Sequence, residues 1–158
     1  MLIQGKLIDG YEDLSEIYKI RKKVFAQKVS ISDGVISDEL DYIAIHAVVY
    51  EGTKQNRMVA TGRMVYDGDT CKIGRIAILK EFRGKKYGDF IVRMLLNKAF
   101  QSGMNQVYAE AQLENIGFYK KIGFRPLETI NLESREKYHK MIIDKDQVLF
   151  PCKQEMNR

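Results

Sequence analysis

The sequence predicts an α/β (α+β) fold in which a central, mixed but mostly antiparallel twisted sheet is flanked by helices on both faces. Two observations predict it. Segments with the periodicity of strands and helices alternate along the 158 residues in the order β-α-β-β-β-α-β-α-β-β. The three consecutive strand segments are separated by short turn-rich stretches, which is typical of an antiparallel meander.

Length and composition favour one folded unit. A chain of 158 residues fits a single domain, and 45% hydrophobic with 30% charged residues is the composition of an ordinary globular protein. The sequence contains no internal repeat, low-complexity stretch or linker-like run of Pro and Ser. We therefore expect residues 1–158 to form a single domain.

The first elements follow from periodicity and turn residues. A strand is expected at Leu2–Ile8, and Asp9 with Gly10 turns the chain into a helix at Asp13–Gln27. Asp13 and Glu16 stand at the spacing of a capping box at the start of this helix. The next segment, Ser30–Asp41, is polar without a clear period, so both a short helix and a mobile loop remain open for it.

The remaining elements complete the sheet. A long amphipathic helix is expected at Lys85–Ser102, because its apolar residues recur at helical spacing and Gly103 stands where a helix ends. A second, shorter helix is expected at Glu114–Lys121. The further strands are expected at Tyr42–Tyr50, Met58–Tyr66, Thr70–Leu79, Gln106–Ala111, Phe124–Ile130 and Tyr138–Phe150.

Several observations indicate a cytoplasmic protein with no membrane partner. No apolar run approaches the roughly 18 residues that a membrane span requires, and the N-terminus lacks a signal peptide. Cys71 and Cys152 lie far apart without CxxC spacing, and we expect both to be packed thiols in a reducing compartment. We expect no metal site, because too few histidines accompany them.

The net charge of +5 and the pI of about 9.1 favour an anionic partner, which could be nucleic acid, a membrane surface or a phosphorylated cofactor. Within Cys71–Leu96, a strand runs into a turn rich in Gly and Lys and then into the long helix. The N-terminus of a helix leaves about four N–H groups unpaired, and it therefore suits a phosphate.

Glycines and cations in this turn strengthen the prediction of an anion site. Gly84 and Gly88 would let the backbone approach a phosphate closely, and Lys80, Arg83, Lys85 and Lys86 surround the same point. The P-loop pattern GxxxxGK[ST] and the dinucleotide pattern GxGxxG are both absent. On the turn alone, an ordinary strand, glycine turn and helix cap that binds nothing stays open.

A second motif lies downstream, where residues 111–126 read AQLENIGFYKKIGFRP. Together the two segments resemble GNAT acetyltransferases, whose turn has the pattern [QR]xxGx[GA]. Arg83 and Gly88 match that pattern, whereas Lys86 replaces its middle glycine. The second motif of the family, an Asn shortly before FYxKxGF, is matched by Asn115, Phe118, Tyr119, Lys121, Gly123 and Phe124. The segment Ile20–Phe25, with His139 and Met141, is similar to a small bacterial branch of this superfamily.

The resemblance implies the GNAT fold and an N-acetyltransferase. Such an enzyme moves the acetyl group of acetyl-CoA to a primary amine by direct attack through a tetrahedral intermediate. It also implies that the strand Arg75–Leu79 splays from its neighbour and offers free backbone groups to the pantetheine arm. The residues that it assigns to acetyl-CoA are Ile76, Ala77, Ile78, Arg83, Gly84, Lys85, Lys86, Tyr87, Gly88, Asp89, Asn115, Phe118 and Tyr119.

Acyl transfer needs an acid for the leaving thiolate and a base for the amine. Tyr119 is the candidate acid by its match to the family motif, although its ring could instead only pack against the core. Glu110 is the candidate base, because the strand Thr70–Leu79 carries no carboxylate; a merely solvated Glu is the alternative. For His46 and His139 we expect buried, hydrogen-bonded side chains, with a functional role near neutral pH as the alternative.

The acceptor is expected to contact the first helix, the polar segment Ser30–Asp41 and the late strands. Asp33, Asp38, Glu39 and Asp41 would suit a cationic amine, although acidic loops are often only solvated. A non-catalytic acyl-CoA sensor is the main rival function. A nucleic-acid-binding domain is a weaker rival, because many aromatic residues fall at core spacing, and we expect no nucleic acid partner. A homodimer formed through the late strands is suggested only by analogy with the fold.

Overall fold

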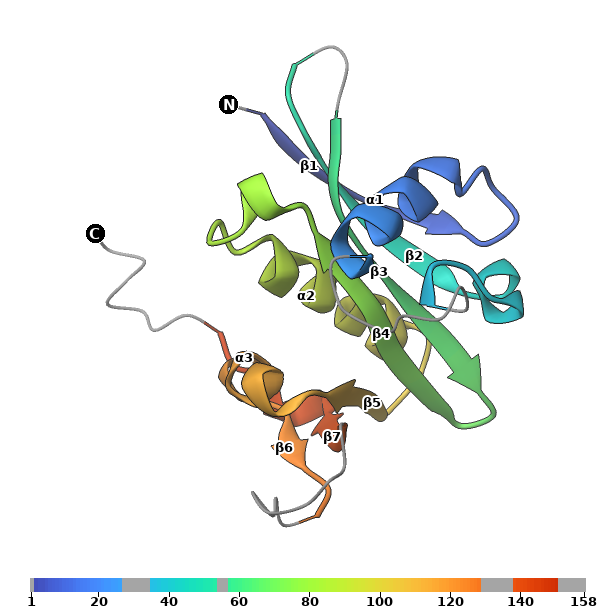
Figure 1. The fold of residues 1–158 in the computed structure, drawn as a ribbon. Helices are drawn as coiled ribbons and strands as arrows, with labels where there is room; N and C mark the ends of the chain where they lie inside the picture. The colour runs from blue at the N-terminus through green and yellow to red at the C-terminus, as the bar shows by residue number, and fades with distance from the viewer. Residues whose placement is uncertain (1, 27–34, 54–56, 129–137, 151–158) are drawn as a thin grey trace.

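The computed structural model describes residues 2–26, 35–53, 57–128 and 138–150. These residues form a seven-stranded sheet in the order β1-β2-β3-β4-β5-β7-β6 (Figure 1). Every neighbouring pair is antiparallel except β4 and β5, which are parallel. The predicted mixed, mostly antiparallel sheet is therefore confirmed.

The N-terminal half of the sheet is built from four strands. They are β1 (Ile3–Asp9), β2 (Ile45–Glu51), β3 (Arg57–Asp67) and β4 (Thr70–Ile78). The meander β2-β3-β4 was predicted from the turn-rich connections, and β1 pairs with β2 along its whole length. Tyr42 belongs to a 3-10 turn at Glu39–Tyr42 and not to β2, so the predicted start of this strand was wrong by three residues.

Helix α1 spans Ser15–Phe25, inside the predicted range. The predicted capping box is wrong, because the N-cap is Leu14 and no side chain caps the helix. The Asp13 carboxylate instead accepts a hydrogen bond from the Ser15 amide at 3.0 Å. The polar segment that follows is described only from residue 35, and the part of the prediction that concerns residues 30–34 lies outside the described residues.

The C-terminal half begins with α2 (Tyr87–Gln101), which ends two residues before Gly103, as predicted. It continues through β5 (Gln106–Ala111), α3 (Ile116–Ile122), β6 (Arg125–Pro126) and β7 (His139–Asp144). The last strand was predicted to run to Phe150 but ends at Asp144, because the chain turns there into a 3-10 segment, Lys145–Gln147.

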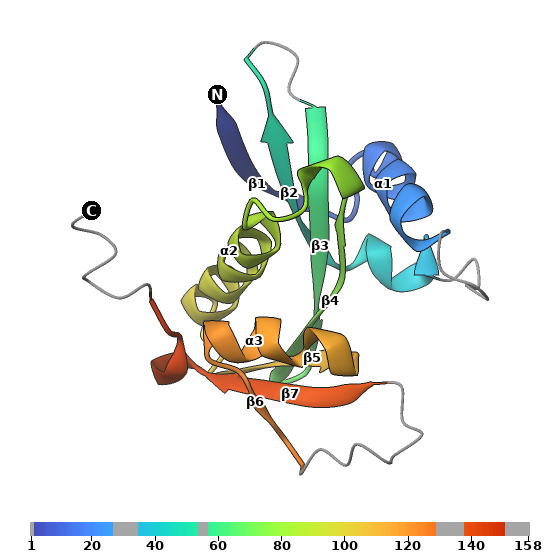
Figure 2. The same cartoon turned by 60° about the vertical axis from the view of Figure 1, so that its left-hand side comes forward.

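Helices cover both faces of the sheet, as predicted. Helix α1 lies on one face, whereas α2 and α3 lie on the other (Figure 2). The larger core lies under α2 and α3 and includes fully buried residues such as Ile73, Ile91 and Leu95. Smaller clusters under α1 contain Ile17 and Ile20.

The Cys71 thiol is packed in this larger core, and burial raises its pKa to about 12. It is therefore the packed thiol that the sequence predicted, whereas Cys152 lies outside the described residues. No helix among the described residues is long and apolar enough to cross a membrane.

Candidate active site

The strands β4 and β5 are joined over a short distance only. In the described part of the chain, their ladder pairs Lys72 with Tyr108 and Ile73 with Ala109 and then stops. Farther along, β4 stays paired with β3, and the Leu79 amide donates to the Val59 carbonyl at 3.0 Å. Because amides of an antiparallel strand alternate in direction, the Ile78 amide points to the side of β5. This end of β4 therefore has the splayed geometry that the sequence led us to expect.

A β-bulge in β4 lies beside the end of that ladder. Gly74 pairs with Arg63 and Ala77 pairs with Thr61, so Arg75 and Ile76 together oppose the single residue Gly62. The φ angle of Arg75 is +54°, a left-handed value that is uncommon for residues other than glycine. The bulge sends the Arg75 side chain to the α1 face, where its guanidinium meets Asp38.

The turn before α2 has a left-handed backbone at the lysine that stands at the glycine position of the family pattern. After a 3-10 turn at Lys80–Phe82, Gly84 has φ +80° and Lys86 has φ +65°. Lys86 is the N-cap of α2, and no side chain caps this helix end. The lysine therefore adopts the left-handed backbone that glycine prefers, at a cost of about 1 to 2 kcal/mol.

Gly88 marks the point where β4, α2 and α3 meet. A Cβ atom at this position would lie 3.0 Å from Ile78 Cδ1 and 3.5 Å from the Phe118 ring. The two motifs that are 30 residues apart in sequence are thus in contact in space. Asn115 is the N-cap residue of α3. It is exposed, and its side chain makes no capping hydrogen bond to the helix.

Tyr87 and Lys85 anchor the turn to β2. The Tyr87 hydroxyl donates to the Glu51 carboxylate at 2.5 Å, and Lys85 Nζ lies 3.6 Å from the same carboxylate. This hydrogen bond, with burial and the negative charge of Glu51, raises the pKa of Tyr87 to about 12. Asp89 pairs one turn onward with Arg93 at 2.7 Å. Sequence reasoning missed Glu51, since nothing near it in sequence shows that it meets this turn.

Tyr119 is nearly buried, with 6% of its surface exposed, and its ring packs edge-on against Phe118 and Phe124. Burial raises the pKa of its phenol to about 12, so the hydroxyl stays protonated at neutral pH. Among the described residues, no hydrogen-bond partner holds this hydroxyl. The side chain thus packs in the core and keeps a proton to donate.

Glu110 lies on the other face of the sheet from Tyr119. Its neighbours Ala109 and Ala111 are buried under α2 and α3, whereas its own side chain is 47% exposed. The carboxylate accepts a hydrogen bond from Lys72 Nζ at 2.6 Å. The candidate acid and the candidate base therefore lie on opposite faces of the sheet.

A charged cluster lies under α1 and was not predicted. Arg21 Nη1 lies 2.9 Å from both oxygens of Asp41, and Arg63 Nη1 donates to Asp41 at 2.9 Å and to Asp38 at 2.5 Å. Arg21 and Asp41 are fully buried. We call Arg21, Asp38, Asp41, Arg63 and Arg75 the α1-face cluster.

The cluster corrects the prediction of an acidic rim. Asp38 and Asp41 do not form an open acidic surface, because both carboxylates are bound by arginines. Burial alone would raise the pKa of Asp41, but the hydrogen bonds and charge of Arg21, with those of Arg63, lower it. Glu39 is exposed, and Asp33 lies outside the described residues.

His46 supports the same cluster. It is fully buried, and its Nε2 lies 2.9 Å from the Asp41 carbonyl, so the proton resides on Nε2. Burial lowers the pKa of His46, which keeps the ring neutral. The prediction of a buried, hydrogen-bonded histidine is confirmed for His46, whereas His139 is only partly buried in β7, opposite Ala111.

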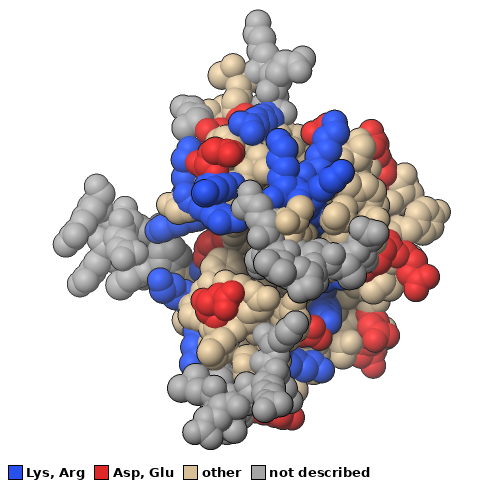
Figure 3. Space-filling view, in the orientation of Figure 1, with Lys and Arg blue, Asp and Glu red and all other residues tan. Residues whose placement is uncertain are grey.

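Basic side chains gather where α1 and the turn before α2 lie, in the upper half of Figure 3. A small hollow of about 240 Å³ in this region is lined by Lys19, Lys22, Lys23 and Arg57 among others. The face shown therefore carries a group of basic side chains over α1 and the turn before α2.

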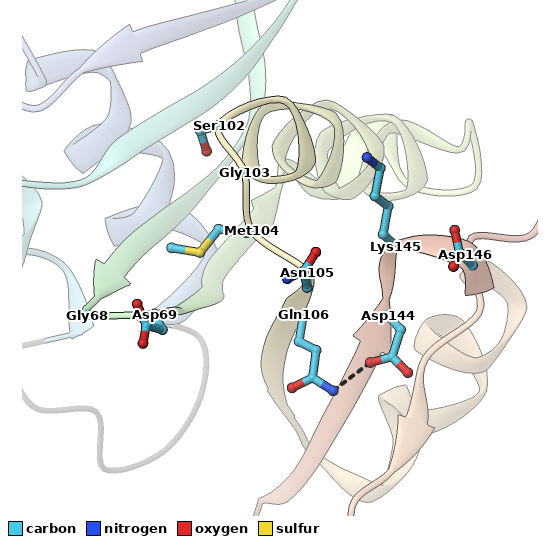
Figure 4. Close-up of a pocket in the computed structure, with 10 residues that line it drawn as sticks. All are labelled: Gly68, Asp69, Ser102, Gly103, Met104, Asn105, Gln106, Asp144, Lys145 and Asp146. Atoms are coloured by element: carbon cyan, nitrogen blue, oxygen red, sulfur yellow. Dashed lines mark hydrogen bonds between the residues drawn. The ribbon is translucent and has the colours of Figure 1, made fainter.

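A cavity of about 800 Å³ lies at the other end of α2 (Figure 4). It is lined by the turn after α2, the β3-β4 turn and the end of β7, and Gln106 donates to Asp144 across one wall at 2.7 Å. None of the predicted site residues lines it. This cavity is therefore separate from the predicted site.

A sequence model described as the acetyltransferase (GNAT) family matches residues 12–124, which include both motifs. The chain belongs to this family. The match covers well over half of the sequence, and it confirms the acetyltransferase class that the two motifs predicted.

The GNAT assignment agrees with a curated relative and with solved structures. The chain is 32% identical over 116 residues to the uncharacterized N-acetyltransferase YjcF of Bacillus subtilis, covering 73% of this chain and 81% of YjcF. The fold is similar to that of an acyl-CoA N-acyltransferase from Pseudomonas aeruginosa, with a TM-score of 0.74 at 20% identity over 89% of this chain and 99% of that one.

A further GNAT structure carries the cofactor. The PaiA N-acetyltransferase from Thermoplasma acidophilum, solved in complex with coenzyme A, has a TM-score of 0.68 at 12% identity and covers 91% of this chain and 99% of that one. The GNAT fold is thus one that binds CoA, and no membrane span interrupts it among the described residues here.

Proposed function

We propose that this GNAT protein transfers the acetyl group of acetyl-CoA to a primary amine by direct attack through a tetrahedral intermediate. The observation that carries the proposal is the stretch of β4 beyond Ile73, which no longer pairs with β5 and whose end, Ile78, lies beside Gly88 at the start of α2. An unpaired strand edge suits the amide-rich pantetheine arm, and the start of a helix suits a pyrophosphate.

The proposed cofactor residues fit CoA chemically. Backbone groups of Ile76, Ala77 and Ile78 would run along the pantetheine arm, with the Ile78 amide facing the unpaired side and that of Ala77 engaged with β3. The positive turn would hold the phosphates through backbone donors and cations, and Gly88 leaves the close approach that a side chain would fill. The turn residues are Arg83, Gly84, Lys85, Lys86, Tyr87, Gly88 and Asp89, with Asn115, Phe118 and Tyr119 from the facing α3.

Tyr119 is proposed as the acid. Its phenol has a pKa of about 12, whereas that of a thiol is about 8.5, so complete proton transfer costs about 5 kcal/mol. A protonated phenol still stabilises the departing thiolate by donating a hydrogen bond as negative charge develops on the sulfur.

Glu110 is proposed as the base. It lies on the face opposite Tyr119 and is solvent-accessible, so it can take the amine proton directly or through one water. Separate faces keep the acid and the base from exchanging a proton with each other. The enzyme would thus admit acetyl-CoA from the side of α2 and α3 and the amine from the side of α1.

The same proposal places the reaction in one domain spanning 1–158, in the cytoplasm, with acetyl-CoA as the co-substrate. The buried, unpaired Cys71 thiol is consistent with a reducing compartment.

The experiment combines calorimetric titration with acetyl-CoA and CoA with an assay of free-thiol release against a panel of amines. We expect acetyl-CoA binding, amine-dependent thiol release, and a loss of about 100-fold in kcat for Tyr119→Phe with cofactor affinity unchanged. Tyr66→Phe is the matched control, because it removes a phenol that bonds Ser102 at the far end of α2.

Each outcome separates the candidate functions. Binding without thiol release for any amine would identify an acyl-CoA sensor and overturn the transferase proposal. Absence of binding would remove the cofactor site itself. If Glu110→Gln retains the full kcat at neutral pH, another group or water is the base.

A further inference from the structure

Glu51 places a carboxylate beside the turn that is proposed to hold the phosphates of CoA. It is the last residue of β2, and only 11% of its side chain is exposed. Among the described residues, two groups hold this carboxylate, the Tyr87 hydroxyl at 2.5 Å and Lys85 Nζ at 3.6 Å. Because both groups belong to the turn and the first position of α2, the carboxylate and a bound phosphate would share the same surroundings.

The two contacts of Glu51 differ in how firmly they are held. Tyr87 is buried, and its short hydrogen bond to the carboxylate fixes the start of α2 to β2. The Lys85 side chain is 42% exposed, and its Nζ also lies 5.1 Å from the centre of the Phe82 ring. A lysine carries its charge on a flexible four-carbon stem. Packing therefore fixes the Tyr87 contact, whereas Lys85 can exchange its partner.

Lys85 is among the cations that are proposed to hold the phosphates of CoA. A carboxylate beside its ammonium group weakens the field that a phosphate meets, because the two opposite charges partly cancel. A phosphate that contacts Lys85 must therefore displace Glu51 or share the ammonium with it. The measured strengths of exposed ion pairs correspond to a factor of about 1.5 to 5 in an equilibrium constant, so this competition changes the affinity for the cofactor without closing the site.

We infer that Glu51 is a counter-ion built into the cofactor site, whose carboxylate competes with the phosphates of acetyl-CoA for Lys85 and so lowers the affinity for the cofactor. This inference rests on the proposed function. Glu51 acts through Lys85 and is therefore a positioning residue. Once the phosphates leave, the carboxylate takes Lys85 back and stabilises the empty site, which favours the release of CoA after each transfer. The bond to Tyr87 keeps the turn in place throughout.

The test is calorimetric titration of the full chain and its Glu51→Gln variant with CoA and acetyl-CoA. Glutamine has the same shape, and its amide oxygen can still accept the hydrogen bond from Tyr87, but the negative charge is gone. We expect Kd for both ligands to fall by about two- to fivefold. If Glu51 were only an anchor for Tyr87, the substitution would leave Kd unchanged or raise it.

A double-mutant cycle makes the result specific to Lys85. Lys85→Gln should raise Kd for CoA by about two- to fivefold more in the Glu51→Gln background than in the wild type, because only there is the lysine free of its carboxylate. The control Glu81→Gln removes a carboxylate from the 3-10 turn before α2 that is 69% exposed and 3.9 Å from Arg57. Its effect on Kd should be smaller and the same with or without Lys85. Thermal unfolding shows whether each variant is folded.

The outcomes distinguish this inference from the proposed function. An unchanged or raised Kd in Glu51→Gln, or a gain in affinity that persists fully in Lys85→Gln, would overturn the inference and leave the transferase standing. If Glu51→Gln does not fold, Tyr87→Phe frees the carboxylate from the phenol. CoA should then bind more weakly, and Lys85→Gln should abolish that weakening; a weakening that persists would overturn the inference. Absence of CoA binding by the wild type would overturn the proposed function itself.

Discussion

The two faces of the sheet are stabilised by different interactions. Under α2 and α3, a large apolar core forms from segments with strong local patterns, and the glycine turn contacts α3 through Gly88 and Phe118. Under α1, the centre is an ion-pair cluster whose partners come from α1, the 3-10 turn and β3. The comparison teaches that the face proposed for the cofactor is encoded locally, while the face proposed for the acceptor depends on charges 20 or more residues apart.

Breaking the ion pairs should have the largest effect. Asp41→Asn removes the carboxylate between two buried guanidinium groups and leaves their charge uncompensated, so we expect a loss of about 3 to 5 kcal/mol in the free energy of unfolding. Urea denaturation measures it. The control Glu39→Gln changes an exposed carboxylate two residues away and should cost less than about 0.5 kcal/mol. Equal stability of the two variants would contradict the role of the cluster.

Acid should weaken the α1 face selectively. The folded-state pKa values of Asp38 and Asp41 are lowered, so their stabilisation is complete above the unfolded value of about 3.9 and is lost as the pH falls through the lowered values. The stability gap between the wild type and Asp41→Asn should therefore be constant from pH 7 to about 5 and shrink below about 4. His46 titrates in both proteins, so its contribution largely cancels from the stability difference between them. A gap that persists undiminished to the lowest pH would show that charge is not its source.

The α2 and α3 face should respond to volume instead. Gly88→Ala places a methyl group 3.0 Å from Ile78 and against the Phe118 ring, and we expect it to cost about 1 kcal/mol of stability and to weaken CoA binding. Gly117→Ala is the matched control. Gly117 is in α3 with no atom within 4 Å of the new Cβ, so this change should stabilise by about 0.5 to 1 kcal/mol. Calorimetry gives the CoA affinity and urea denaturation gives the free energy of unfolding. If both variants changed the free energy of unfolding in the same direction, the close contact at Gly88 would be refuted.

The smallest effect is expected in the turn before α2. Lys86→Gly removes the strain of a left-handed lysine but adds chain entropy to the unfolded state, for a net gain of about 0.5 kcal/mol. Lys85→Gly removes the same charge from a neighbour without a positive φ angle, and it should destabilise the protein. CoA affinity measured in parallel shows how much the charge of each lysine contributes to cofactor binding. Stabilisation by both variants would mean that the left-handed backbone is not the cause.

Sequence reasoning succeeded where the signal is local. The long helix, the meander and the residues of both motifs could be predicted because periodicity and turn residues lie within short windows. Tyr119 was chosen from its motif and its role as the acid stays a prediction, whereas its burial and raised pKa came only from the structure.

The failures have a common physical cause. The Arg21 to Asp41 pair spans 20 residues and the Arg63 to Asp38 pair spans 25, and such contacts leave no periodic trace in the sequence. The same applies to Glu51 and Tyr87, 36 residues apart. Asp38 and Asp41 were therefore grouped with nearby acids, although their arginine partners decide their role. The bulge at Arg75 was also missed, because residues other than glycine seldom signal a left-handed backbone.

The two-pair ladder between β4 and β5 has a consequence for how tightly the backbone is protected. Amides of β4 that face β3 belong to a long ladder, whereas the Ile78 amide faces the side where pairing has ended. Hydrogen exchange with solvent should therefore be fast on one side of this strand and slow on the other, and acetyl-CoA should slow the fast side. A part of the sheet whose pairing has ended would then be the part that the bound acetyl-CoA completes.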